Sequence, residues 1–238
     1  MTRRLLLLSS ARDGNGVFLL HSSTAIRTLL GPSVHSVLLI PYAGVTITPE
    51  RYAERAAVPF GKLGYELRSI TEARDAVEAV ESAQAIVVGG GNTFRLLASL
   101  YDRELLEPIR ARVHAGVPYI GWSAGAVITA TTMGTTNDMP IVEPKSLRAL
   151  NLVPFQINAH YTDFHPPGHQ GETRAERLEE YIEVNRGVRV IGLPEGCSLR
   201  VTDEEIALSG LGTAPVFAYG EPRTEYSAGD DISFLLRG

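Results

Sequence analysis

Residues 119–127 read YIGWSAGAV, an apolar segment that leads into a serine between two glycines and then into helix-forming residues. The spacing Gly121-x-Ser123-x-Gly125 fits a nucleophile elbow, in which a tight strand-to-helix turn lifts a serine hydroxyl above a sheet. Small residues are needed beside the serine because strand and helix pack closely there. A helix beginning at the serine also directs free N–H groups and its positive end toward the hydroxyl. Ordinary βα turns show the same pattern by chance, so a base, an orienting acid and oxyanion donors must come from elsewhere in the chain.

Length and composition indicate a single α/β domain over residues 1–238. Hydrophobic content of 44% and charged content of 21% are typical of a soluble globular protein. The net charge of −5, with no run of Lys or Arg, argues against nucleic acid or a membrane surface as partner. The only cysteine, Cys197, excludes an internal disulfide and favours a cytoplasmic location. The apolar run at residues 5–8 is too short for a signal peptide and predicts a buried strand.

Strands and helices are expected to alternate as far as Ser123. The predicted strands lie at residues 3–10, 34–42, 65–70, 85–88 and 117–122, and the segment at 34–42 is apolar almost throughout. The predicted helices lie at residues 22–30, 48–63 with a break near Pro59, 75–83, and 93–115 with an interruption before Pro108. This alternation predicts a mostly parallel sheet flanked by helices. Ligand sites of such sheets lie beyond the carboxyl ends of the strands, where residues 89–93 and Ser123 fall.

The pattern changes after Ser123. A polar loop is expected at residues 131–137, followed by a strand at 152–159 and a loop rich in His, Pro and Gly at 161–171. A helix at 172–184 and a strand at 188–193 follow, and residues 198–236 read as short antiparallel strands.

The glycine-rich turn at residues 89–93 (GGGNT) lacks the lysine of a P-loop and the spacing of a dinucleotide fold. It is equally consistent with an oxyanion hole, in which the backbone amides of Gly90 and Gly91 would act with that of Ala124. Asn92 suits two roles, as the N-cap of the following helix or as a substrate ligand.

His160 is the best candidate for the base among the six histidines, because it directly follows the predicted strand at 152–159. The acid that orients it is either Asp138 or Glu195, and the residues alone do not choose between them. A metal site made of His160, Asp163, His165 and His169 matches no known ligand spacing, so we expect neither metal nor cofactor.

Five motifs in order resemble those of the peptidase E family, α-aspartyl dipeptidases among the serine peptidases. They are residues 89–97 (GGGNTFRLL), 121–126 (GWSAGA), 158–160 (NAH), 171–174 (GETR) and 193–196 (LPEG). The resemblance covers residues 5–236 and implies a fold similar to class I glutamine amidotransferases, with C-terminal antiparallel strands.

The resemblance implies that Ser123 is the nucleophile, His160 the base and Asp138 the acid, with Glu195 as the alternative orienter. The implied reaction is metal-free cleavage of dipeptides with an N-terminal aspartate. Arg174, in the first turn of the predicted helix at 172–184, opposes the helix dipole and suits bidentate binding of the substrate carboxylate. A surface ion pair with Glu176 or Glu180 is the structural alternative for Arg174.

Other functions share some of these features. A cyanophycinase-like enzyme would cleave a β-aspartyl polymer with the same serine elbow, an α/β-hydrolase esterase shares the Ser…Asp…His order, and a non-catalytic binding module is least favoured. A glutaminase is disfavoured because Ser123 stands where that class uses cysteine. The expected partner is a small peptide, and a homodimer is left open.

Overall fold

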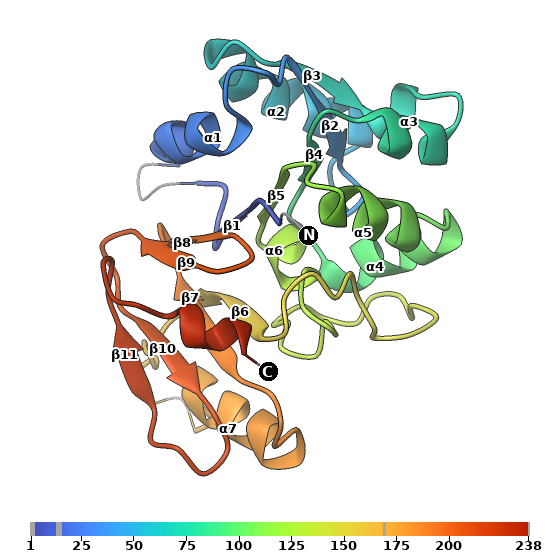
Figure 1. The fold of residues 1–238 in the computed structure, drawn as a ribbon. Coiled ribbons are helices and arrows are strands. Elements are labelled where there is room, and N and C mark those ends of the chain that lie inside the picture. The colour runs from blue at the N-terminus through green and yellow to red at the C-terminus, as the bar shows by residue number, and fades with distance from the viewer. Residues whose placement is uncertain (1–2, 13–15, 169, 238) are drawn as a thin grey trace.

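The computed structural model describes residues 3–12, 16–168 and 170–237, and these form two β-sheets with helices packed around them (Figure 1). Residues 13–15 of a predicted loop, and His169, lie outside the described residues. The seven-stranded central sheet has the order β3-β2-β4-β5-β1-β8-β9. The first five strands in this order run parallel to one another, whereas β8 is antiparallel to β1 and β9 is antiparallel to β8. Its strands are β1 (Leu5–Leu8), β2 (Ser36–Ile40), β3 (Glu66–Ser69), β4 (Ile86–Val88), β5 (Tyr119–Trp122), β8 (Ser198–Val201) and β9 (Ile206–Ser209).

The inner strands β1 and β4 of the central sheet are buried on both faces, which explains their unbroken apolar sequences, whereas the edge strand β3 exposes Glu66 and Arg68. Successive side chains of a strand point to opposite faces, so Leu5 and Leu7 of β1 join one hydrophobic cluster while Leu6 and Leu8 join another. One cluster includes residues of α3 to α6 and the other those of α1 and α2, on opposite sides of the sheet (Figure 1). These helices are α1 (Ser23–Leu30), α2 (Pro49–Lys62), α3 (Ala76–Ser82), α4 (Thr93–Asp102), α5 (Leu106–His114) and α6 (Ala124–Val127), with short 3₁₀ turns η1 (Leu20–Ser22) and η2 (Ile70–Glu72).

The interruption predicted before Pro108 is confirmed, because α4 ends at Asp102 and α5 starts at Leu106. Glu104 takes a left-handed conformation (φ 55°), and the amide of Leu105 bonds back to the carbonyl of Leu100, a common way to end a helix. The break predicted near Pro59 is wrong: α2 continues through Pro59 to Lys62, and burial of Pro59 and Phe60 compensates for the lost backbone hydrogen bond.

A second, four-stranded sheet has the order β11-β10-β7-β6, with only β6 and β7 parallel. Its elements are β6 (Gln156–Tyr161), β7 (Val190–Pro194), β10 (Ala214–Phe217) and β11 (Thr224–Tyr226), followed by the 3₁₀ turn η3 (Ser233–Leu236). Helix α7 (Arg174–Val184) packs on this sheet through Leu178 and Ile182, which cluster with Val190 and Phe217. The predicted antiparallel C-terminal strands are therefore present but divided between the two sheets.

The two sheets share a hydrophobic core, since Leu5 and Leu7 belong to the same cluster as Ile157 of β6 and Ile191 of β7. The carboxyl ends of β1 and β5 lie near those of β6 and β7, since Ser9 bonds to His160 and Leu193 and Ser123 bonds to His160. Within the described part of the chain, no helix is both long and apolar enough to cross a membrane.

Candidate active site

Ser123 occupies a strained elbow between β5 and α6, with φ 52° and ψ −117°. The flanking glycines are needed because side chains would collide with the backbone. A Cβ atom on Gly121 would overlap the carbonyl oxygen of Gly125, and one on Gly125 would overlap that of Val88. The motif therefore forms the elbow that the sequence predicts.

A hydrogen-bonded chain connects Ser123 with two side chains of the second sheet. Nε2 of His160 lies 2.9 Å from Oγ of Ser123, and Nδ1 of His160 lies 2.8 Å from Oε1 of Glu195. A carboxylate only accepts hydrogen bonds, so Nδ1 carries the proton and donates it to Glu195. Nε2 is then left to accept the serine hydroxyl, the arrangement that a general base requires.

His160 lies within β6, which begins at Gln156, whereas the sequence predicts a strand at 152–159 that ends just before it. The histidine has a left-handed conformation (φ 55°) at a bulge where the pairing of β6 with β7 shifts register. A bulge re-aims a side chain, and here it directs the imidazole toward Ser123.

Ser9, which sequence reasoning missed, fixes the backbone of this bulge. The amide of His160 donates to Oγ of Ser9 (2.9 Å), and the Ser9 hydroxyl donates to the carbonyl of Leu193 in β7 (2.7 Å). Ser9 is fully buried and directly follows β1. It thus joins the end of the central sheet to the strand that carries the histidine, and its position after the apolar run was the only signal in the sequence.

Asp138, predicted to orient the imidazole, forms no hydrogen bond with His160 among the described residues, whereas the alternative orienter, Glu195, does. The Asp138 carboxylate accepts hydrogen bonds from the amide (2.7 Å) and hydroxyl (2.6 Å) of Thr93 and from the hydroxyl of Thr136 (3.2 Å). The physical reason is the start of α4, where free amides and the positive end of the helix attract a carboxylate. Its second oxygen, Oδ1, has no hydrogen-bond partner among the described residues.

The backbone amides of Gly90, Gly91 and Ala124 donate no hydrogen bond within the described segments. A Cβ on Gly90 would lie 2.8 Å from Cβ of Ser123, and one on Gly91, whose φ is 143°, would overlap the carbonyl of Ala43. Only glycine therefore fits this approach to the serine, as an oxyanion hole needs.

Tyr52 holds the glycine turn in place. Its hydroxyl donates to the carbonyl of Gly90 (2.9 Å) and accepts from Nε1 of Trp122 (3.0 Å). Burial raises the pKa of Tyr52 to about 12, so it stays a neutral donor at physiological pH.

The side chains of Asn92 and Arg174, both predicted to bind substrate, differ in how many of their hydrogen-bonding atoms are already used within the protein. Asn92 caps α4 by accepting from the amide of Arg95 (3.0 Å) and donates to the carbonyl of Met139 (2.8 Å), which matches its structural role.

Arg174 donates to the carbonyl of His160 (2.8 Å), and no described carboxylate pairs with it, so the surface pair with Glu176 or Glu180 is absent. Burial, followed by repulsion from Arg177, lowers the pKa of Arg174.

A cavity of about 470 Å³ opens beside Ser123 and His160. Phe18 and Trp122 line its apolar side in edge-to-face contact, with ring centroids 5.8 Å apart. Arg12 and Arg55 also line it, and neither pairs with a carboxylate among the described residues. The sequence signal for Arg55 was weak: it lies one helical turn after Tyr52 in α2, and both residues were read only as part of a helix.

No group of three or more His, Cys, Asp or Glu side chains gathers as a metal site in the described residues, and His169 lies outside them. Cys197 is buried and sits apart from the cavity, and burial raises the pKa of its thiol.

Comparison with known proteins agrees with this geometry. Residues 5–209 match the model of peptidase family S51. The chain belongs to this family. It is 45% identical to a peptidase E of a Nostoc species over 236 residues, covering 99% of this chain and 98% of the relative. It is 42% identical to peptidase E of Shewanella denitrificans, covering 99% and 100%.

Two solved structures share the fold. One, described as a peptidase E protein of Listeria monocytogenes, aligns with a TM-score of 0.67 at 23% identity, covering 89% of this chain and all of that one. A peptidase from an acI-B1 actinobacterium aligns with a TM-score of 0.72 at 20% identity, covering 98% of both chains. The α/β fold is thus that of family S51, and this member is a serine-type peptidase.

Proposed function

We propose that this enzyme is a dipeptidase that removes an N-terminal aspartate through Ser123, His160 and Glu195. The hydrogen-bonded chain from Glu195 through His160 to Ser123 is the observation that carries the proposal. Family membership supports serine-dependent dipeptide hydrolysis, and the single buried cysteine is in keeping with a cytoplasmic enzyme whose one domain spans residues 1–238.

The reaction follows from these positions. Ser123 attacks the peptide carbonyl while Nε2 of His160 takes its proton, and Glu195 stabilises the resulting imidazolium. The amides of Ala124 and the Gly90–Gly91 turn stabilise the oxyanion. His160 then gives the proton to the leaving amine, and a water molecule activated by the same histidine hydrolyses the acyl-enzyme.

Arg174 is the proposed ligand for the side-chain carboxylate of the first residue. Its guanidinium is half-buried beside the backbone of His160 and uses one nitrogen there, which leaves donors for a carboxylate. An arginine remains charged even when burial lowers its pKa. The free Oδ1 of Asp138 is the proposed acceptor for the substrate ammonium, because an N-terminal aspartate brings a cation as well as an anion.

The test is a panel of Xaa-Leu dipeptides that differ only in the first residue. The wild-type enzyme is expected to prefer Asp-Leu, and Arg174→Ala to lose roughly 10- to 100-fold in kcat/KM for Asp-Leu with little change for Ala-Leu. Arg177→Ala, an exposed neighbour on the same helix, is the matched control and should keep the preference. Equal losses on Asp-Leu and Ala-Leu would remove Arg174 from specificity, and a wild-type preference for neutral residues would reject the aspartyl assignment.

A further inference from the structure

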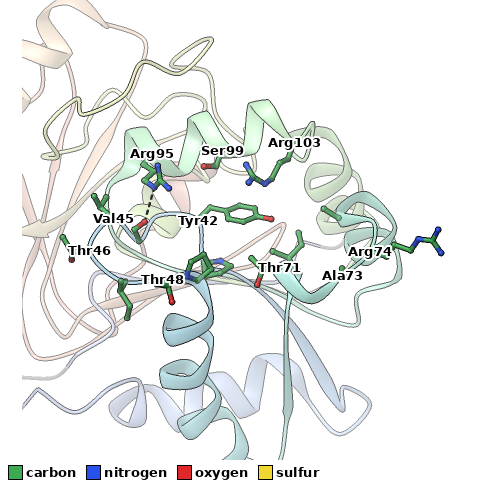
Figure 2. Close-up of a pocket in the computed structure, with 16 residues that line it drawn as sticks. Tyr42, Val45, Thr46, Thr48, Thr71, Ala73, Arg74, Arg95, Ser99 and Arg103 are labelled. Atoms are coloured by element: carbon green, nitrogen blue, oxygen red, sulfur yellow. Dashed lines mark hydrogen bonds between the residues drawn. The ribbon is translucent and has the colours of Figure 1, made fainter.

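A second cavity, of about 690 Å³, lies at the carboxyl ends of β2 and β3 and contains none of the residues assigned to catalysis (Figure 2). Helix α4 covers one side, and the loop from Tyr42 to Thr48, with η2, forms the other. The crevice beyond the carboxyl ends of parallel strands is where α/β sheets commonly bind ligands.

The lining of this cavity is cationic although the whole chain is acidic. Its 16 residues include Arg74, Arg95 and Arg103 but no Asp or Glu. Arg95 and Ser99 are four residues apart and share one face of α4, and Arg103, four residues further on, is the C-cap residue that directly follows the helix. Figure 2 shows Arg95 and Arg103 over the cavity while Arg74 points outward, so the first two arginines carry the argument.

Arg95 and Arg103 are held in place by contacts that do not neutralise their charge. Nε of Arg95 donates to the carbonyl of Gly44 (3.1 Å), and the guanidinium carbon of Arg103 lies 4.5 Å from the ring centroid of Tyr42. Neither forms an ion pair among the described residues.

Two carboxylates that flank the cavity in sequence, Asp75 and Asp102, have partners outside it. Asp75 caps α3 through the amide of Val77 (2.8 Å), and Asp102 faces Lys145 (3.9 Å). With no acidic residue in the lining and no described ion pair on Arg95 or Arg103, both guanidinium groups have donors left for a ligand.

We propose that this cavity binds a small oxyanion of the phosphate class, either free phosphate or the phosphate group of a small metabolite. Planar guanidinium groups form paired hydrogen bonds with phosphate oxygens. The hydroxyl of Ser99, which has no hydrogen-bond partner in the described structure, lies between the two arginines and supplies a further donor. Burial raises the pKa of Tyr42, which keeps its hydroxyl protonated as well.

This anion site adjoins the catalytic glycine turn. Arg95 holds the carbonyl of Gly44, and the preceding carbonyl, that of Ala43, accepts the amide of Asn92 (2.9 Å) beside Gly91. Ile47 lines both this cavity and the one beside Ser123. The two cavities are therefore adjacent.

The test is calorimetric titration of the full-length protein with inorganic phosphate at constant ionic strength. Saturable binding is expected, weakened about tenfold or more by Arg103→Ala, which removes a charged donor, and by Ser99→Asp, which places a carboxylate between the arginines. Arg27→Ala, which removes one exposed charge from α1, is the control and should bind as the wild type does. Ser99→Asp keeps the test valid if Arg103→Ala does not fold.

Absence of saturable binding, or equal binding by the wild type and both variants, would overturn the proposal. Binding weakened by Arg55→Ala or Arg174→Ala but not by Arg103→Ala would assign the anion to the active-site cavity and also overturn it. Phosphoserine, titrated beside inorganic phosphate, distinguishes the two sources: a clearly tighter complex would indicate a phosphate-bearing metabolite.

Discussion

Nδ1 of His160 and Oε1 of Glu195 lie 2.8 Å apart, although 35 residues of sequence separate them. The pairing of β6 with β7 brings them together, since His160 lies near the end of one strand and Glu195 directly follows the other. The Glu195 side chain is 69% exposed. It therefore orients the imidazole in a partly solvated environment, where its electrostatic contribution is weakened by water.

Replacement of this carboxylate is the first prediction. Glu195→Gln should lower kcat by about 10²- to 10⁴-fold, because the amide no longer fixes the tautomer in which Nε2 accepts a proton. It should also slow the labelling of Ser123 by a sulfonyl fluoride, which needs no substrate recognition.

Asp138→Asn provides the comparison. It should leave the labelling of Ser123 unchanged and act mainly on kcat/KM for peptides with a free amino terminus. Slowed labelling in Asp138→Asn, with normal labelling in Glu195→Gln, would restore Asp138 as the orienting acid.

The second prediction concerns Ser9, whose hydroxyl joins the His160 amide to Leu193. Ser9→Ala leaves a buried amide and a buried carbonyl unpaired, so it should cost about 1–3 kcal/mol of stability. Because it frees the bulge that aims His160, kcat for Asp-Leu should fall while KM changes little. Ser10→Ala, which removes only a bond to the carbonyl of Arg12, is the control. A loss of stability without any change in kcat would limit Ser9 to a structural role.

The third prediction concerns the leaving residue of the substrate. Arg12 and Arg55 line the cavity beside His160 and pair with no carboxylate among the described residues, and a dipeptide ends in a carboxylate. Arg55→Ala should raise KM for Asp-Leu by roughly tenfold or more, through loss of a charge-assisted hydrogen bond, and should hardly affect the amide Asp-Leu-NH₂. Arg51→Ala, on the same helix but outside the cavity, is the matched control. Equal effects of Arg55→Ala on the acid and the amide would argue against carboxylate recognition.

The fourth prediction concerns the loop after His160, where Arg223 pairs with Asp163 (2.6 Å). Hydrogen bonds from Arg223 hold the pKa of Asp163 below its usual value. A carboxyl group with a lowered folded-state pKa stabilises the protein above its unfolded-state pKa of about 3.9, and this stabilisation disappears as the pH falls through the lower, folded-state value.

Asp163→Asn should therefore lower the free energy of unfolding at pH 7 by about 1 kcal/mol, since the pair is partly exposed and screened by water. Denaturation at a series of pH values should show the difference from the wild type shrinking below about pH 4. A difference that stays constant down to pH 2 would mean that the ion pair is not its source.

The elbow and the glycine turn could be predicted from sequence because their chemistry is local. Gly121, Ser123 and Gly125 lie within one turn, and residues 89–93 follow a strand of the same parallel sheet. His160 was found for a related reason, its place at the end of an apolar segment, although its position inside β6 and its bulge were not foreseen.

The remaining site residues depend on long-range packing that no local pattern encodes. The choice between Asp138 and Glu195 depends on which loop reaches the imidazole. Asp138 instead bonds to the amide of Thr93 at the start of α4, and Glu195 bonds to His160. Ser9 bonds to partners far along the chain, and Arg55 joins the cavity through packing of distant segments, so neither has a recognisable motif. Similarly, the division of the C-terminal strands between two sheets depends on pairing with β1 and β7.

Hydrolysis of Asp-Leu by purified Ser123→Ala, measured beside the wild type and with its fold checked by circular dichroism, tests most directly whether this serine is the nucleophile. The variant is expected to lose about 10⁴- to 10⁶-fold in kcat, as happens when the nucleophile of a serine peptidase is removed. A folded Ser123→Ala variant that kept turnover close to that of the wild type would contradict the mechanism.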